Sequence, residues 1–182
     1  MKAIEIVVER FSVEAYAPFG DPILEPNRSA DFVEAWSNAW LLPTDMDGRP
    51  QFVFLRHFPQ PLTFSLMERH FNVAQGFVPI TRHPYLMVVA GASDAKLPAC
   101  EAIRAFLLDG TFGLTIKRGV WHTLDRFPAT DEPMDMLFLT ELETQREMIE
   151  KDGHPEELER SEIVDLGVSF SITDPNALLK FR

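Results

Sequence analysis

Two short stretches of the chain carry side chains suited to acid–base or metal chemistry. The sequence ERHFNVAQ places Glu68 and His70 two positions apart and ends at Gln75. Residues two apart on a β-strand share one face, so Glu68 and His70 would point the same way. Much later, a Gly-x-x-His unit ends at His122. Imidazole and carboxylate groups act as general acids and bases, and with an amide oxygen they also suit a divalent ion.

Short β-strands are the elements expected to position these side chains. Short runs of apolar or alternating residues recur between Gly, Pro and Asp, a pattern typical of a sandwich or barrel. The expected strands cover residues 3–8, 52–58, 63–69, 74–79, 85–90, 102–108, 112–116, 134–139 and 163–172. Long helical patterns do not alternate with them, which disfavours a parallel α/β fold.

Two short surface helices are also expected. The first covers residues 12–16, with Ser12 as its N-cap. The second runs from Thr140 to Lys151, where Thr140 and Glu143 have the spacing of a capping box, and it would stop near Gly153.

Length and composition indicate one globular domain covering residues 1–182. The chain is 46% hydrophobic and 25% charged, with a net charge of −11. That charge argues against nucleic acid or an anionic membrane as a partner. An anionic small-molecule substrate would require a local cluster of cations.

The compartment expected for the chain is the cytoplasm. Its one cysteine, Cys100, excludes an internal disulfide, fits a reducing compartment and is interpreted as a small buried hydrophobe. The first residues lack the uninterrupted apolar core of a signal peptide. The longest apolar run, residues 85–92, is shorter than the ~20 residues that a membrane helix needs.

The two polar stretches resemble the two cupin motifs. The first motif carries metal-binding side chains at positions one, three and eight, which here hold Glu68, His70 and Gln75. The second motif ends in Gly-x-x-His, matched by Gly119 and His122. The resemblance implies an all-β, cupin-like β-barrel or jelly roll in which these side chains converge. A divalent metal ion is then the candidate cofactor, with Glu68, His70, Gln75 and His122 as ligands. Glu and Gln replace the usual first His and last Glu, so these two residues could equally serve catalysis or substrate binding.

Longer stretches, in the same order, resemble the ureidoglycolate lyase family. They are residues 14–21, then 66–70, 75–79 and 86–90, and finally 103–106, Gly110 and 118–122, together spanning roughly residues 10 to 140. The chain departs from the family where Thr123 replaces a second histidine. Residues 28–50 and the part after Glu141 also look longer or different.

The family resemblance implies a homodimer that splits ureidoglycolate into glyoxylate and urea during allantoin and purine breakdown. His122 is the expected base for the hydroxyl proton, because neutral imidazole is poised near neutral pH. Glu68 or His70 would return the proton to urea or hold a divalent ion.

A carboxylate clamp and pocket walls complete the expected site. Arg104 is the expected clamp, because a guanidinium binds a carboxylate through two hydrogen bonds. A surface ion pair with Glu101 is an equally good reading of Arg104. Substrate contacts are expected from Arg104, Gln75, Lys117, Arg118 and Trp121. Trp121 and Phe77 would wall the pocket, although ordinary core packing explains both as well.

Two other functions stay open. A cupin lyase, hydrolase or isomerase could act on another small hydroxy or amino acid derivative, with Thr123 reshaping the pocket. A non-enzymatic, metabolite-binding cupin is disfavoured because the acidic chain has no DNA-binding segment. His57, His83 and His154 are interpreted as structural histidines, since nothing in the sequence pairs with them.

Overall fold

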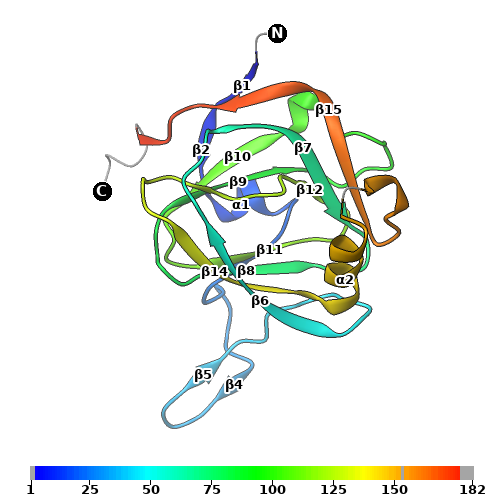
Figure 1. The fold of residues 1–182 in the computed structure, drawn as a ribbon. Coiled ribbons are helices and arrows are strands. Elements are labelled where there is room, and N and C mark those ends of the chain that lie inside the picture. Colours follow the sequence, from blue (N-terminus) through cyan, green and yellow to red (C-terminus); the bar gives the residue numbers. More distant parts are fainter. Residues whose placement is uncertain (1–2, 153, 177–182) are drawn as a thin grey trace.

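Two β-sheets make up most of the computed structural model, which describes residues 3–152 and 154–176 (Figure 1). The larger, eight-stranded sheet has the order β1 (Ile4–Ile6), β15 (Ser161–Ile172), β7 (Thr63–His70), β12 (Trp121–His122), β9 (Tyr85–Ala90), β10 (Arg104–Leu108) and β2 (Val8–Arg10), with β13 (Phe127–Pro128) paired to β9. The two end strands, β1 and β2, follow each other in the chain, so this sheet curls into a nearly closed barrel. The predicted all-β, cupin-like fold is confirmed.

The smaller sheet faces the larger one. Its five strands have the order β3 (Pro22–Ile23), β11 (Gly113–Ile116), β8 (Gln75–Pro79), β14 (Met134–Glu141) and β6 (Pro50–His57). A separate hairpin of β4 (Phe32–Val33) and β5 (Asn38–Ala39) projects away from both sheets at the bottom of Figure 1. The helical elements are α1 (Val13–Tyr16), α2 (Leu142–Glu150) and two 3₁₀ turns, Cys100–Ala102 and Pro155–Glu157. Among the described residues, no helix has the length and apolar character needed to cross a membrane.

Two apolar cores lie on opposite faces of the larger sheet. One is formed by that sheet alone and includes Met67, Val88 and Trp121. The other joins the two sheets and includes Met87 from β9 and Phe77 from β8. Neighbouring residues on one strand supply different cores because their side chains alternate between faces.

Eight of the nine predicted strands are found with boundaries that agree within two residues. The predicted strand 3–8 is instead divided at Val7 into β1 and β2, which pair with different strands. The N-cap at Ser12 is also confirmed, because its Oγ accepts a hydrogen bond from the Ala15 amide at 3.2 Å. The two-residue strands β3, β4, β5, β12 and β13 were not predicted, because two residues are too few to display a period of two.

Two local predictions are wrong. Thr140 belongs to β14, which pairs with β6 as far as Glu141, so α2 begins at Leu142 without a capping box. Glu141 stands at the N-cap position and accepts a hydrogen bond from the Thr144 hydroxyl instead. Cys100 is exposed rather than buried. The predicted stop at Gly153 lies outside the described residues.

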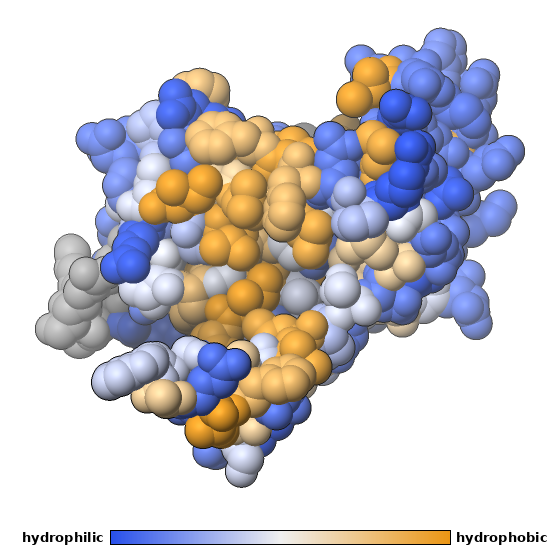
Figure 2. Space-filling view, turned by 90° about the horizontal axis from the view of Figure 1, so that it is seen from below, coloured by the Kyte–Doolittle hydropathy of each residue, from blue (hydrophilic) through white to orange (hydrophobic). Residues whose placement is uncertain are grey.

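The outer face of the smaller sheet is unusually apolar. Phe54 on β6, Leu137 on β14 and Val78 on β8 form one register row across it. Phe52 and Phe54 remain 65% and 59% exposed, and Trp36 in the hairpin is 98% exposed. Figure 2 views this side of the molecule and shows the apolar side chains gathered across it.

The turn after α1 packs so closely on β11 that residue 20 must be glycine. A Cβ built on Gly20 would lie 1.8 Å from the Thr115 carbonyl oxygen. We expect Gly20→Ala to lower the free energy of unfolding by roughly 1–3 kcal/mol, as overpacking does. Chemical denaturation measures this change. Gly91→Ala is the matched control, since its Cβ would meet no atom within 4 Å. Equal stability of the two variants would contradict this close approach.

Candidate active site

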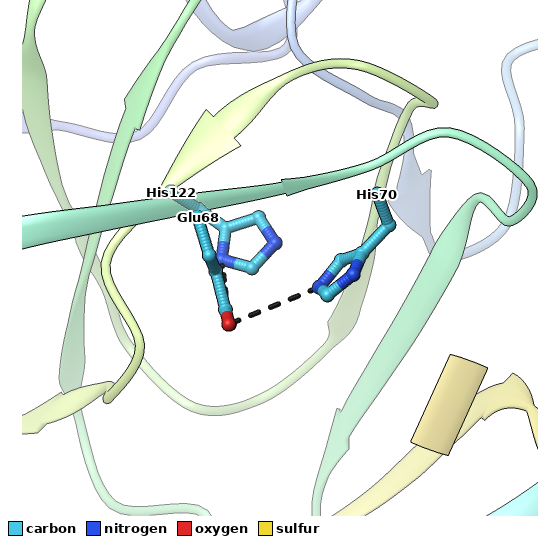
Figure 3. A group of neighbouring side chains, drawn as sticks. All are labelled: Glu68, His70 and His122. Atoms are coloured by element: carbon cyan, nitrogen blue, oxygen red, sulfur yellow. Dashed lines mark ion pairs between the residues drawn. The ribbon is translucent and has the colours of Figure 1, made fainter. Parts of the chain in front are cut away.

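Glu68, His70 and His122 meet on the face of the larger sheet that is turned towards the smaller sheet (Figure 3). β12 pairs with β7 so that His122 lies directly opposite Glu68, and β7 places His70 on the same face as Glu68. Oε1 of Glu68 lies 3.4 Å from Nδ1 of His122 and 3.8 Å from Nε2 of His70. The three side chains offer donor atoms within 4.8 Å of one another, and all three are buried. The structure therefore brings together three of the side chains that the sequence predicts for the site.

A cavity of about 270 Å³ opens beside this cluster, between the two sheets. Glu68 and His70 line it from the larger sheet, and Gln75 and Phe77 line it from β8. The remaining lining residues are Leu55, His57, Leu124, Asp125, Arg126, Phe138, Gln145 and Met148. His122 is absent from this lining, because it lies behind Glu68 with only 1% of its surface exposed.

Contacts at Nδ1 orient the imidazoles of His70 and His122. Nδ1 of His70 lies 2.8 Å from the Ser161 hydroxyl, and Nδ1 of His122 lies 3.1 Å from the Thr123 carbonyl oxygen. A carbonyl only accepts, so we assign the His122 proton to Nδ1. Nε2 of both histidines and Oε1 of Gln75 are buried without a hydrogen-bond partner. Two of these three atoms, Nε2 of His70 and Oε1 of Gln75, belong to residues that line the cavity.

The interior favours neutral histidines. Burial, then the Arg126 guanidinium and the His70 ring, holds the pKa of His122 well below its usual value, against the opposing effect of the Thr123 hydrogen bond. Burial and then Arg126 lower the pKa of His57 to about 4, while Asp125 opposes them. Both rings therefore remain uncharged at neutral pH.

Sequence reasoning missed Arg126, His57 and Asp125. Arg126 comes four positions after His122, in the loop that follows β12, where no strand period predicts its direction. His57, interpreted from the sequence as structural, lies on the inner face of β6 and lines the cavity. The alternation of β6 was the available signal, since it places Val53, Leu55 and His57 on one face.

The structure places four predicted substrate contacts outside the cavity. Arg104 pairs with Glu9 rather than Glu101, at 2.5 Å, and Lys117 donates to the Ala17 carbonyl. Arg118 pairs with Asp45 and Asp47. Trp121 is fully buried in the core of the larger sheet, beneath the Arg69 guanidinium. Of the predicted substrate contacts, Gln75 alone reaches the cavity.

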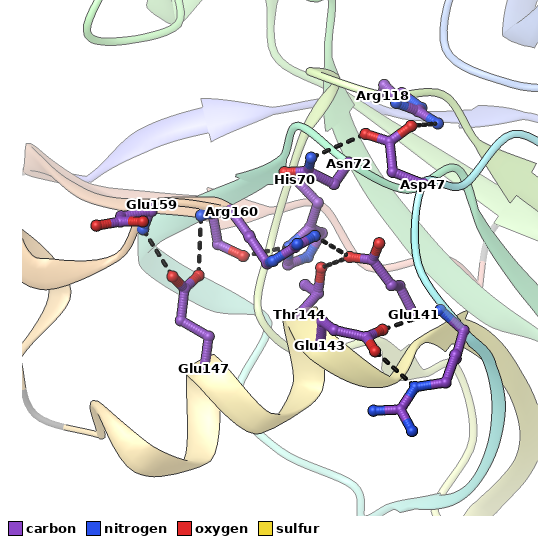
Figure 4. A network of polar contacts seen from close by, with 12 residues as sticks. Asp47, His70, Asn72, Arg118, Glu141, Glu143, Thr144, Glu147, Glu159 and Arg160 are labelled. Carbon is purple, nitrogen blue, oxygen red and sulfur yellow. Dashed lines mark hydrogen bonds and ion pairs between the residues drawn. The ribbon is translucent and has the colours of Figure 1, made fainter.

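The helix α2 lines the cavity with Gln145 and Met148 and is held by a polar network (Figure 4). Glu147 accepts hydrogen bonds from the amides of Glu159 and Arg160 at 2.8 and 2.9 Å. The Arg160 side chain in turn donates to the buried Glu141 at 2.8 Å. The network therefore joins the cavity wall to the segment that leads into β15.

Fold and site together define a cupin-like barrel with a polar cluster inside. The family model described as ureidoglycolate lyase matches residues 3–153. A ureidoglycolate lyase of Pseudomonas savastanoi pv. phaseolicola is 34% identical over 127 residues, covering 65% of this chain and 73% of the relative. One from Azotobacter vinelandii is 37% identical over 128 residues, covering 63% and 73%. The chain belongs to the ureidoglycolate lyase family.

Protonation of His57 should destabilise the fold in mild acid. Its pKa is about 4 when folded and about 6.5 when unfolded, so the unfolded chain binds the proton more tightly. The free energy of unfolding therefore falls as the pH drops from about 6.5 towards 4, and His57 accounts for roughly 1–2 kcal/mol of the loss by pH 5. Chemical denaturation at pH 7 and pH 5 should show a smaller loss in His57→Gln than in wild type. The exposed His154 provides the control His154→Gln, which should retain the full loss. An unchanged loss in His57→Gln would contradict the assignment.

Proposed function

We propose that this chain cleaves ureidoglycolate to glyoxylate and urea. The observation that carries the proposal is the buried cluster of Glu68, His70 and His122 beside a small cavity, at the positions of the cupin motifs, in a chain of this family. A cavity of about 270 Å³ suits a small metabolite rather than a polymer. The same cavity supports, as the alternative, a cupin enzyme acting on another small hydroxy acid derivative.

The reaction is an elimination that moves one proton. Glu68 lines the cavity and His122 does not, so the geometry favours Glu68 rather than His122 as the base. Glu68 takes the hydroxyl proton, the carbon–oxygen double bond of glyoxylate forms, and the carbon–nitrogen bond breaks. The departing nitrogen then takes the proton from Glu68, which restores the carboxylate. His70 presents its free Nε2 to the same space, and His122 lies against the Glu68 carboxylate, with Nδ1 3.4 Å from Oε1.

A divalent metal ion fits the same residues. Glu68, His70 and His122 provide one carboxylate and two imidazoles, and Gln75 adds an amide oxygen with no other partner. This donor set suits a borderline or hard divalent ion. When bound, such an ion would polarise the substrate oxygen as a Lewis acid.

The cellular setting belongs to the same proposal. We propose a cytoplasmic enzyme of allantoin and purine breakdown, as the family resemblance implies. The absence of disulfides is consistent with this setting, since Cys100 is the only cysteine in the sequence. Glyoxylate and urea would be the products available to later steps.

Substitutions in the cluster should remove activity in two distinguishable ways. Glu68→Gln should lower turnover by ~10²–10⁴-fold, because positioned acid–base groups contribute that much. His122→Ala should lower it by roughly 100-fold by misplacing Glu68, and should also shift the acidic limb of the pH–rate profile. Release of glyoxylate and urea is measured with and without chelator, and His154→Ala is the control.

The same assay separates the competing functions. Loss of bound metal in Glu68→Gln would identify Glu68 as a ligand, whereas loss of rate with metal retained would identify it as a proton carrier. Wild-type protein that releases neither product but converts another hydroxy acid in a panel would transfer the proposal to that substrate. Binding without turnover of any compound would favour a metabolite-binding role.

We also propose a homodimer formed through the apolar outer face of the smaller sheet and the neighbouring hairpin. An arm that projects beside an apolar face allows two copies to exchange arms about a two-fold axis. Phe32, Trp36, Phe52 and Phe54 are all more than half exposed. At ~150–250 Å² per aromatic side chain, these four residues expose on the order of 500 Å² of apolar surface per copy. A standard interface buries roughly 800 Å² per partner. A second copy is favoured over an anionic membrane because the chain carries a net charge of −11.

Removing the aromatic contacts should separate the copies. The double variant Trp36→Ser, Phe54→Ser should be monomeric at micromolar concentration, where wild type is dimeric by light scattering. Val7→Ser is the control, because Val7 is 67% exposed but lies between β1 and β2. A monomeric wild type would contradict the homodimer, and a dimeric double variant would contradict this face.

A further inference from the structure

Arg126 is a buried cation without a carboxylate partner among the described residues. Only 2% of its surface is exposed. Its Nη1 donates to the Thr123 and Asp125 carbonyls at 2.5 and 3.4 Å, and its Nε has no hydrogen-bond partner. The guanidinium lies 4.4 Å from the centre of the Phe77 ring. Backbone carbonyls and an aromatic face thus fix the group without neutralising its charge.

Other arginines of the described chain are satisfied differently. Arg56, Arg69, Arg104 and Arg118 each pair with an Asp or Glu at 2.9 Å or less. Those four pairs leave little charge to offer a ligand. A buried charge without a paired group of opposite charge is strongly unfavourable. Burial accordingly lowers the pKa of Arg126, but a guanidinium stays protonated at neutral pH.

The surroundings of Arg126 add a second polar group facing the same cavity. His57 lines the cavity, and its Nε2 is buried without a partner. Asp125 does not compete for Arg126, because its side chain is 63% exposed and meets His57 only at 3.9 Å. Nη2 of Arg126 lies 3.4 Å from Nδ1 of His122, so the cation borders the cluster of Glu68, His70 and His122.

We propose that Arg126 is the carboxylate-binding residue of this cavity, with Nε2 of His57 as a second contact. The carboxylate of a small hydroxy or oxo acid would pair directly with the guanidinium, which no described carboxylate does, and would leave the adjoining carbon beside Glu68. This inference deepens the proposed function by assigning the end of the substrate that does not react. Binding of a carboxylate can be measured without any turnover.

The test uses glyoxylate, glycolate and the neutral glycolamide as probes, with calorimetry on the full chain. Arg126→Met keeps the contact with Phe77 but removes the charge, so we expect glyoxylate and glycolate to bind roughly 10–100-fold more weakly, as loss of charge-assisted hydrogen bonds implies. Glycolamide should bind equally to both proteins. Arg104→Met is the matched control: it removes a cation paired with Glu9 outside the cavity and should leave carboxylate binding unchanged.

A second measurement covers the case in which Arg126→Met does not fold. In wild type labelled with ¹⁵N-arginine, titration with glyoxylate should shift the Nε resonance of Arg126 and leave that of Arg104 in place. Unweakened glyoxylate binding by folded Arg126→Met, or an unmoved Arg126 resonance at saturation, would overturn the inference. So would the absence of carboxylate binding at millimolar concentration.

The two proposals fail separately. Carboxylate binding through Arg126 without lyase activity would preserve the inference and reject the proposed reaction. Wild-type lyase activity with an unchanged KM in Arg126→Met would do the reverse.

Discussion

The pairing of β7 between β15 and β12 is the constraint on which the site depends. β15 sets Ser161 opposite His70 and Ile163 opposite Glu68, while β12 sets His122 opposite Glu68. A shift of one residue in this pairing would turn Glu68 and His70 towards the core of the larger sheet, and their neighbours on β7 would face the cavity instead. The first five residues of β15, Ser161 to Asp165, therefore hold in register the end of β7 that carries the cluster.

Polar groups buried between the two sheets need hydrogen-bond or charge partners, which come from one another or from a ligand. Glu68 is flanked by two imidazoles, and burial, followed by the nearby Arg126 guanidinium, lowers the pKa of His122 and keeps that ring neutral. The Thr123 carbonyl accepts hydrogen bonds from both His122 and Arg126, so one backbone group orients the imidazole and the guanidinium. Thr123 fills this role through its backbone, so the role does not depend on the Thr123 side chain.

Local patterns predicted the strands and the central cluster because both repeat at short range. The period of two paired Glu68 with His70, and it also separates Trp121 from His122, since neighbours on a strand face opposite sides. Arg104 was misplaced for a different reason: Glu9, its partner, reaches it through the parallel pairing of β10 with β2. Arg126 lies in a loop whose path is set by tertiary packing. Contacts made across distant segments were the part that one sequence leaves open.

The anchoring of α2 has a mechanical consequence for entry into the cavity. Gln145 and Met148 of α2 form part of its wall, and Glu147 ties the same helix to the amides of Glu159 and Arg160. The next residue, Ser161, touches His70. An outward movement of α2 would strain the hydrogen bonds of Glu147 and displace Ser161, which orients the His70 imidazole. The position of α2 is therefore coupled to the orientation of His70, so a change that moves the helix also disturbs the imidazole.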